Sequence, residues 1–65
     1  MMNTSKCFSY YEAVDKHGLI LAQTTDLEGA LRCLPVDGTI FFVTELHHRS
    51  DKRLTVVITK DVIEL

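Results

Sequence analysis

The stretch TDLEGALRCLP, residues 25–35, is the segment of this chain with the clearest helical signature. Thr25 followed three residues later by Glu28 fits a capping box, and an acidic first turn interacts favourably with the helix dipole. Pro35 ends the element. The apolar residues that recur at helical spacing, and so share one face, are Leu27, Ala30, Leu31 and Leu34. The stretch therefore predicts one short helix with one apolar face.

Both parts of the chain that flank this helix have the composition of β-hairpins. Residues 7–24 hold two strand-like runs separated by DKHG, in which Gly18 can adopt the positive φ of a tight turn. After the helix, TIFFVTELHH and LTVVITKDVIEL are rich in β-branched and aromatic residues and are separated by RSDKR. The order ββαββ predicts an α+β fold with one four-stranded antiparallel sheet covered on one face by the helix. A right-handed crossover gives the strand order 2-1-3-4, and 1-2-4-3 is also compatible.

Length and composition indicate one small folded domain over residues 1–65. The hydrophobic content is 46% and the net charge is −2, whereas disordered chains combine low hydrophobicity with high net charge. No apolar run reaches the length of a signal peptide or a membrane span, so we expect a cytoplasmic protein without membrane contact. Cys7 and Cys33 could form at most one disulfide, and we expect two free thiols that are buried or partly buried.

The phase of the strands is set by the last one, because successive side chains in a strand point to opposite faces. We expect Leu54, Val56 and Ile58 to lie beneath the helix. The rest of the predicted strand core consists of Phe8, Tyr10, Leu19, Leu21, Ile40, Phe42 and Leu46.

One helix can cover only one face of the sheet, so this phase leaves an apolar face open. A contiguous patch of this kind predicts a protein-binding surface, although a small domain also has too little polar surface to cover itself. The predicted open-face residues are Tyr11, Ile20, Phe41, Val43 and Val57, accompanied by Ala13 and Ala22. A second candidate surface for protein binding is acidic and consists of Asp26, Glu28, Asp37 and Glu45.

The stretch HHRSDKR, residues 47–53, raises the question of a metal site. Adjacent histidines in a strand project to opposite faces, so His47 and His48 cannot close on one ion. The sequence has no Cys-x-x-Cys or His-x-x-x-His spacing and no recognisable arrangement of nucleophile, base and orienting group. We therefore expect no metal, no cofactor and no enzymatic activity.

The same stretch is also the most basic part of the chain. His47, Arg49, Lys52 and Arg53 are candidates for a nucleic-acid contact or for the rim of a protein interface. Exposed aromatic residues beside a basic hairpin could stack on bases. However, phosphate binding requires an excess of basic residues, and the net charge of this chain is −2. We interpret the stretch first as a solvated turn that protects a sheet edge, with nucleic-acid binding as the alternative.

The run YYEAVDKHGLILAQTTDLEGALRCL, residues 10–34, reads as aromatic strand, turn, apolar strand and capped helix. In this pattern, in length and in composition, the chain resembles small ββαββ proteins of bacteriophages and mobile elements, among them anti-CRISPR inhibitors of type I interference complexes. The resemblance implies a non-enzymatic protein that binds a Cas subunit and blocks DNA recognition or nuclease recruitment. Some such proteins mimic DNA with acidic residues, and the weak net charge argues against extensive mimicry here.

The leading hypothesis is an inhibitory protein-binding module that acts on a host protein complex, with a homodimer as a second expected partnership. The alternatives are a small nucleic-acid-binding module and a small regulatory domain without independent activity.

Overall fold

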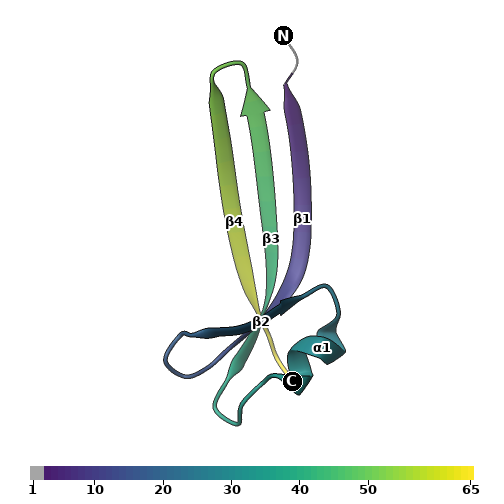
Figure 1. The fold of residues 1–65 in the computed structure, drawn as a ribbon, viewed down its shortest axis with the longest axis vertical. Coiled ribbons are helices and arrows are strands. Elements are labelled where there is room, and N and C mark those ends of the chain that lie inside the picture. Colours follow the sequence, from purple (N-terminus) through teal and green to yellow (C-terminus); the bar gives the residue numbers. More distant parts are fainter. Residues whose placement is uncertain (1–2) are drawn as a thin grey trace.

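A computed structural model describes residues 3–65 as an elongated antiparallel sheet with a short helix at one end (Figure 1). The strand order is β2-β1-β3-β4, which confirms the predicted ββαββ arrangement and the order 2-1-3-4; the order 1-2-4-3 is wrong. The elements are β1 (Thr4–Val14), β2 (Ile20–Thr24), α1 (Leu27–Arg32), β3 (Thr39–Ser50) and β4 (Arg53–Ile63).

The first hairpin turn is built around Asp15 and Gly18. The Asp15 carboxylate accepts hydrogen bonds from the backbone N–H groups of His17 and Leu19, each at 2.9 Å, which fixes the turn by an Asx-type contact. Gly18 has a φ of 85°, as the sequence predicts for this position. Because the turn is specified locally by these residues, β2 is placed against β1.

The helix α1 begins one residue later than the capping box predicts. Asp26 is the N-cap, and its side chain accepts a hydrogen bond from Glu28 N at 3.3 Å, so the prediction of Thr25 as the cap is wrong. The reason is that Thr24 is the last paired residue of β2, and its hydroxyl accepts from Asp26 N at 3.1 Å, which moves Asp26 into the cap position. The helix has six residues, and no helix within residues 3–65 is long and apolar enough to cross a membrane.

The helix packs on the sheet through small side chains. Ala30 and Ala13 are both fully buried and form a core cluster with Ile40, and these small residues let helix and sheet approach closely. Leu31 is exposed, so the prediction that it shares the buried face is wrong; the short helix presents Ala30 to β1 and β2 instead. The partly buried residues around the cluster are Tyr11, Ala22, Leu27, Leu34 and Ile63.

The strand register overturns part of the predicted core. Tyr11 faces Phe42 and Ala13 faces Ile40 across the β1–β3 ladder, so these four residues lie on the face that α1 covers. Ile40 is buried as predicted. The residues wrongly predicted to lie beneath the helix are Phe8, Tyr10, Leu54, Val56 and Ile58, which lie on the other face, and Leu19, Leu21 and Leu46, which are exposed.

The physical reason for this error is the position of the helix along the sheet. Figure 1 shows α1 and β2 at one end, while β1, β3 and β4 continue far beyond them. We call residues 4–9, 44–50 and 53–59 the distal half of the sheet. It has three strands, and no helix in the part of the chain that the structure describes lies on either of its faces. The alternation of apolar and polar residues in this half of β4 therefore does not indicate which face of the sheet the helix covers.

The chain at Gly38 must lack a side chain. A Cβ there would lie 2.7 Å from Leu34 Cδ1 and 2.8 Å from the backbone oxygen of Val14, and the latter cannot move without disturbing β1. We expect Gly38→Ala to lower the free energy of unfolding by about 2 kcal/mol through overpacking. Gly18→Ala meets no neighbouring atom but keeps a positive φ, so it should cost about 1 kcal/mol. Urea unfolding measures both; a Gly38→Ala variant as stable as the parent would contradict this packing.

Candidate functional site

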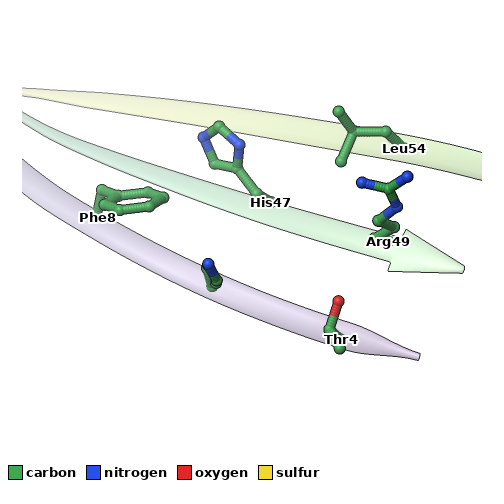
Figure 2. Close-up of a pocket in the computed structure, with 6 residues that line it drawn as sticks. Thr4, Phe8, His47, Arg49 and Leu54 are labelled. Atoms are coloured by element: carbon green, nitrogen blue, oxygen red, sulfur yellow. The ribbon is translucent and has the colours of Figure 1, made fainter. Parts of the chain in front are cut away.

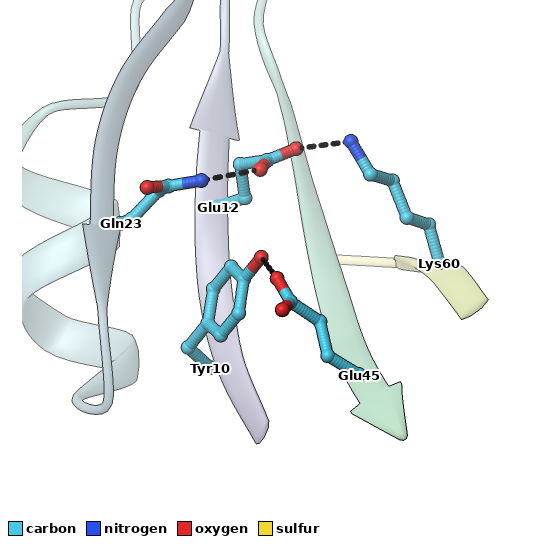
Figure 3. Close-up of polar contacts among 5 residues, drawn as sticks. All are labelled: Tyr10, Glu12, Gln23, Glu45 and Lys60. Atoms are coloured by element: carbon cyan, nitrogen blue, oxygen red, sulfur yellow. Dashed lines mark hydrogen bonds and ion pairs between the residues drawn. The ribbon is translucent and has the colours of Figure 1, made fainter. Parts of the chain in front are cut away.

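The face of the sheet opposite α1, called here the open face, divides into two parts. Close to the helical end it carries a network of polar side chains, and in the distal half it carries apolar and basic side chains (Figures 2 and 3). The register places Glu12 opposite Phe41, and Tyr10, Val43 and Lys60 in one row across β1, β3 and β4. Within residues 3–65, no helix or strand covers either part.

Glu12 is the centre of the polar network. Its side chain is almost completely buried, with the residue only 1% exposed, although it lies on the open face. Gln23 Nε2 donates to Glu12 Oε2 at 3.0 Å, and Lys60 Nζ donates to Glu12 Oε1 at 2.8 Å (Figure 3). Each carboxylate oxygen thus has a partner, and the partners come from β2 and β4, on either side of β1.

The contacts of Glu12 determine its ionisation. Burial by itself raises the pKa of Glu12, but the hydrogen bonds from Lys60 and Gln23, together with the Lys60 charge, outweigh burial and hold that pKa below its usual range. The carboxylate is therefore ionised at neutral pH. It is held by a neighbouring cation and an amide, which leaves it acting as a structural anchor and not as a proton donor.

A second polar contact lies beside the first. Tyr10 Oη donates to Glu45 Oε2, and His47 Nε2 donates to Glu45 Oε1 at 2.9 Å. The hydrogen bond to Glu45, with smaller effects of burial and of the two nearby carboxylates, raises the pKa of Tyr10 to about 12. The hydrogen bonds from Tyr10 and His47 outweigh partial burial and lower the pKa of Glu45. Tyr10 thus stays protonated and Glu45 ionised at neutral pH.

These polar side chains cover the apolar residues beneath them. Val43 is 0% exposed although no helix lies above it, because its cross-strand neighbours Tyr10 and Lys60 reach over it to their carboxylate partners. Lys60 Nζ also lies 6.0 Å from the centre of the Phe41 ring, within the range of a cation–π contact. The polar network thus replaces a second helix on this part of the sheet.

The distal half of the open face has a different chemistry. A shallow hollow of about 360 Å³ lies between β1, β3 and β4, and Figure 2 shows side chains of Phe8, His47 and Arg49 along it. Phe8 is 48% exposed and meets the His47 ring edge-on, with 5.1 Å between ring centres. The complete lining is Thr4, Lys6, Phe8, His47, Arg49 and Leu54. The hollow therefore offers an aromatic ring beside two cationic side chains.

The predicted apolar binding residues do not form one surface. Tyr11 lies on the helix-covered face with its ring 5.3 Å from that of Phe42, and Val57 lies on that same face beyond the helix. Ile20 is exposed at the irregular end of the β1–β2 ladder. Phe41 and Val43 do lie on the open face, but Val43 is buried. Placing all five on one surface is therefore wrong. Directly opposed residues of neighbouring strands point to the same face, so Tyr11 lies on the face of its partner Phe42, opposite to Phe41.

The acidic candidates are also separated by the structure. Asp26 caps α1, and Glu28 lies in its first turn, 3.7 Å from Arg32. Asp37 lies in the turn before β3. Glu45 lies on the open face, where Tyr10 and His47 occupy its carboxylate. These four residues consequently do not make one acidic surface, because the helix stands on the opposite side of the sheet from Glu45.

The basic candidates are brought closer together. His47 and Arg49 line the hollow with Lys6, which the sequence interpretation did not single out. Lys52 and Arg53 lie at the adjoining hairpin turn, in a second depression that shares Arg49 and Leu54 with the first. Lys6 could be found only once the register placed it opposite His47.

The two histidines of the pair diverge, and the two cysteines lie apart on the surface. His47 points to the open face and His48 to the other, where its Nδ1 lies 2.8 Å from Ser5 Oγ, so the predicted divergence is confirmed. No cluster of three metal-ligating side chains is present in residues 3–65. Cys7 and Cys33 are free, but both are exposed, and the prediction of burial is wrong because Cys7 lies beyond the helix and Cys33 caps its end.

Comparisons with known proteins suggest no function for this chain. Neither the family models, nor the curated proteins, nor the solved structures contain a match to this chain. The fold and the arrangement of the open face must therefore carry any functional conclusion.

Removing the partner of Glu12 should have a pH-dependent effect on stability. We expect Lys60→Met to lower the free energy of unfolding by about 2 kcal/mol at pH 7, because it strips a charge-assisted hydrogen bond from a buried carboxylate. In the parent, the lowered pKa of Glu12 adds stability above the unfolded value of 4.5, and this stability is lost as pH falls through the folded pKa. The gap between parent and variant should therefore narrow below pH 4.5.

Urea unfolding at a series of pH values measures this gap. Lys52→Met is the matched control, because Lys52 is exposed in the β3–β4 turn, and it should leave stability almost unchanged at every pH. A Lys60→Met effect of equal size at acid and neutral pH would show that Glu12 ionisation does not depend on Lys60.

Proposed function

We propose that this chain is a non-enzymatic protein-binding inhibitor module that contacts its target through the distal half of the open face. The observation that carries the proposal is the exposure of Phe8, Val56 and Ile58 on one face of three strands that no helix covers. Apolar side chains left in contact with water on a small protein favour an interaction surface. The inhibitor acts in the host cytoplasm.

The composition of this face fits a protein partner. An exposed aromatic ring lies among β-branched and aliphatic residues, with Lys6 and Arg49 at the rim of the hollow. Protein interfaces characteristically combine an apolar centre having aromatic residues with a polar rim. The cations at this rim favour a partner surface that carries carboxylates around an apolar centre.

The proposed target is a subunit of a type I CRISPR interference complex. Its basis is the resemblance of the chain to small ββαββ inhibitors of these complexes, because the side chains themselves identify no partner. Binding without catalysis would act by occupying the surface where the complex recognises DNA or recruits its nuclease.

Two neighbouring residues on opposite faces of β1 allow a matched test. We expect Phe8→Lys to weaken binding to the purified interference complex by at least about tenfold, because it puts a charge at the apolar centre of the contact. Ser9→Lys adds the same charge to the other face of the same strand and should leave binding unchanged. Surface plasmon resonance measures both, and plating of a targeted phage on a host with an active type I system measures inhibition.

Outcomes of this comparison separate the surface from the target. If the parent chain neither binds any type I complex nor protects the phage, the proposed target is wrong. If it binds and both lysine variants bind equally well, the open face is not the contact.

A nucleic-acid-binding module is a second candidate, favoured by the convergence of Lys6 and Arg49 beside the exposed ring of Phe8. Cationic side chains beside an exposed ring can bind a single strand through phosphate contacts and base stacking. The two basic residues of the turn, Lys52 and Arg53, adjoin the same hollow.

For this candidate we expect a labelled single-stranded RNA to bind in a salt-dependent manner. Neutralising Lys6 and Arg49 with glutamine should reduce the slope of log affinity against log salt by about 1.4, or about 0.7 for each lost phosphate contact. Lys16→Gln, in the turn at the other end of the sheet, is the control and should not change the slope. Fluorescence anisotropy measures the binding. If the labelled RNA does not bind even at low salt, nucleic-acid binding is excluded as the function.

A further inference from the structure

The outer edge of β4 is the largest unpaired part of the sheet. β4 pairs with β3 on one side only, and each residue from 53 to 62 is exposed. Alternate residues of an edge strand direct their backbone N–H and C=O groups away from the sheet, where they can pair with another strand. An eleven-residue edge strand therefore presents a long hydrogen-bonding template.

The centre of this edge, residues 54–59, lacks the features that usually prevent pairing. Natural proteins block sheet edges with lysine, proline, bulges or very short strands. The stretch LTVVIT, residues 54–59, contains no charge and no proline, and the irregularity described in the sheet lies between β1 and β2. Lys60 comes next, but its ammonium group turns inward to Glu12 at 2.8 Å. The centre of the edge is thus uncharged, and no proline or bulge prevents another strand from pairing with it.

The centre of β4, residues 55–59, is nearly symmetrical about Val57, although Leu54 falls opposite Lys60. If two copies meet edge to edge and antiparallel, with a two-fold axis through Val57 and perpendicular to the sheet, each residue faces one on the same side of the sheet. Val56 then faces Ile58 of the second copy, and Thr55 faces its Thr59. Pairs of β-branched residues and pairs of threonines are favourable across antiparallel strands.

Charge complementarity selects this register. With Val57 on the axis, Arg53 of each copy faces Asp61 of the other, at both ends of the interface. Both side chains are exposed, and no ion pair within residues 3–65 uses either of them. Moving the axis to Val56 puts Arg53 opposite Thr59, and moving it to Ile58 puts Arg53 opposite Ile63. Of these three registers, only the one centred on Val57 pairs opposite charges within the strand Arg53–Ile63.

The rows of side chains also continue across such an interface. Cys7, Leu46 and Val57 form one row on the face that carries α1, and Leu46 and Val57 are both exposed in the single chain. With Val57 on the axis, this row meets its own copy and becomes a continuous apolar stripe across both molecules. The interface would therefore shelter apolar surface as well as backbone groups.

We propose that β4 pairs with β4 of a second copy around Val57, so that two chains form one continuous sheet of eight strands, four from each copy. The two-fold axis keeps both helices on one face of the joined sheet. The pairing uses the strand edge and leaves the hollow of the open face uncovered, so it holds or fails independently of the proposed function.

Disulfide trapping tests the register. Directly opposed Cα atoms in antiparallel strands lie about 4.5–5.5 Å apart, within the range of about 4.4–6.8 Å that a disulfide bridges. In a chain with Cys7→Ser and Cys33→Ser, we expect Val57→Cys to form a covalent dimer under mild oxidation. Thr55→Cys alone should form no covalent dimer, and it should cross-link when mixed with Thr59→Cys. Failure of Val57→Cys to cross-link, or equal cross-linking of Thr55→Cys alone, would overturn the register.

Exchange of the charges at Arg53 and Asp61 tests the same pairing without introduced cysteines. Sedimentation equilibrium of the full chain should show a monomer–dimer equilibrium. Arg53→Asp should raise the dissociation constant roughly tenfold, because both attractive pairs become repulsive. The double variant Arg53→Asp with Asp61→Arg should restore the parent value. A chain that is monomeric at every accessible concentration, or a dimer indifferent to Arg53→Asp, would overturn the proposal.

Discussion

A carboxylate at the centre of a sheet loses most of its hydration and needs equivalent partners from the protein. Glu12 obtains them from Gln23 on one neighbouring strand and from Lys60 on the far edge strand. The Lys60 side chain must cross β3 to reach Glu12, and in doing so it covers Val43 and the ring of Phe41. One ionic contact thus holds three strands together and shields apolar surface that the helix cannot reach.

The rest of the architecture follows from the small size of the helix. Its six residues cover one end of one face, so the core is confined to a cluster around Ala13, Ala30 and Ile40. Beyond this cluster the sheet is stabilised by backbone ladders and by cross-strand side-chain pairs, such as Phe8 with His47. Because the helix is too short to reach the distal half, that half has no core, and its side chains are available to contact another molecule.

The features that local sequence could predict are those that local interactions determine. The ββαββ order follows from the turn at Gly18 and the helical spacing after Thr25. The handedness of the crossover left two strand orders open, and only the long-range pairing of β1 with β3 decides between them. The phase of β4 could not be obtained from Leu54, Val56 and Ile58, because the helix never reaches those residues.

The binding face was predictable only in part for a related reason. The divergence of His47 and His48 needs only strand alternation, and the structure confirms it. The burial of Glu12, by contrast, depends on a lysine 48 residues away. The gathering of Lys6 with Arg49 likewise needs the β1–β3 register, which joins distant parts of the chain. No pattern within either strand carries that information.

The sequence separation of Glu12 and Lys60 has a consequence for the order in which the protein folds. The β3–β4 hairpin closes over two residues, Asp51 and Lys52, whereas the Glu12–Lys60 contact spans 48 residues and requires β1 to be aligned beside β3 first. Local hairpins form faster than such long-range ladders. Until β1 arrives, the ammonium group of Lys60 has no buried carboxylate to bind and remains in water beside the exposed strand, where a charge opposes premature association. Completion of the sheet pairs that charge with Glu12, so the charge opposes association at the edge of β4 less in the finished fold than before β1 arrives.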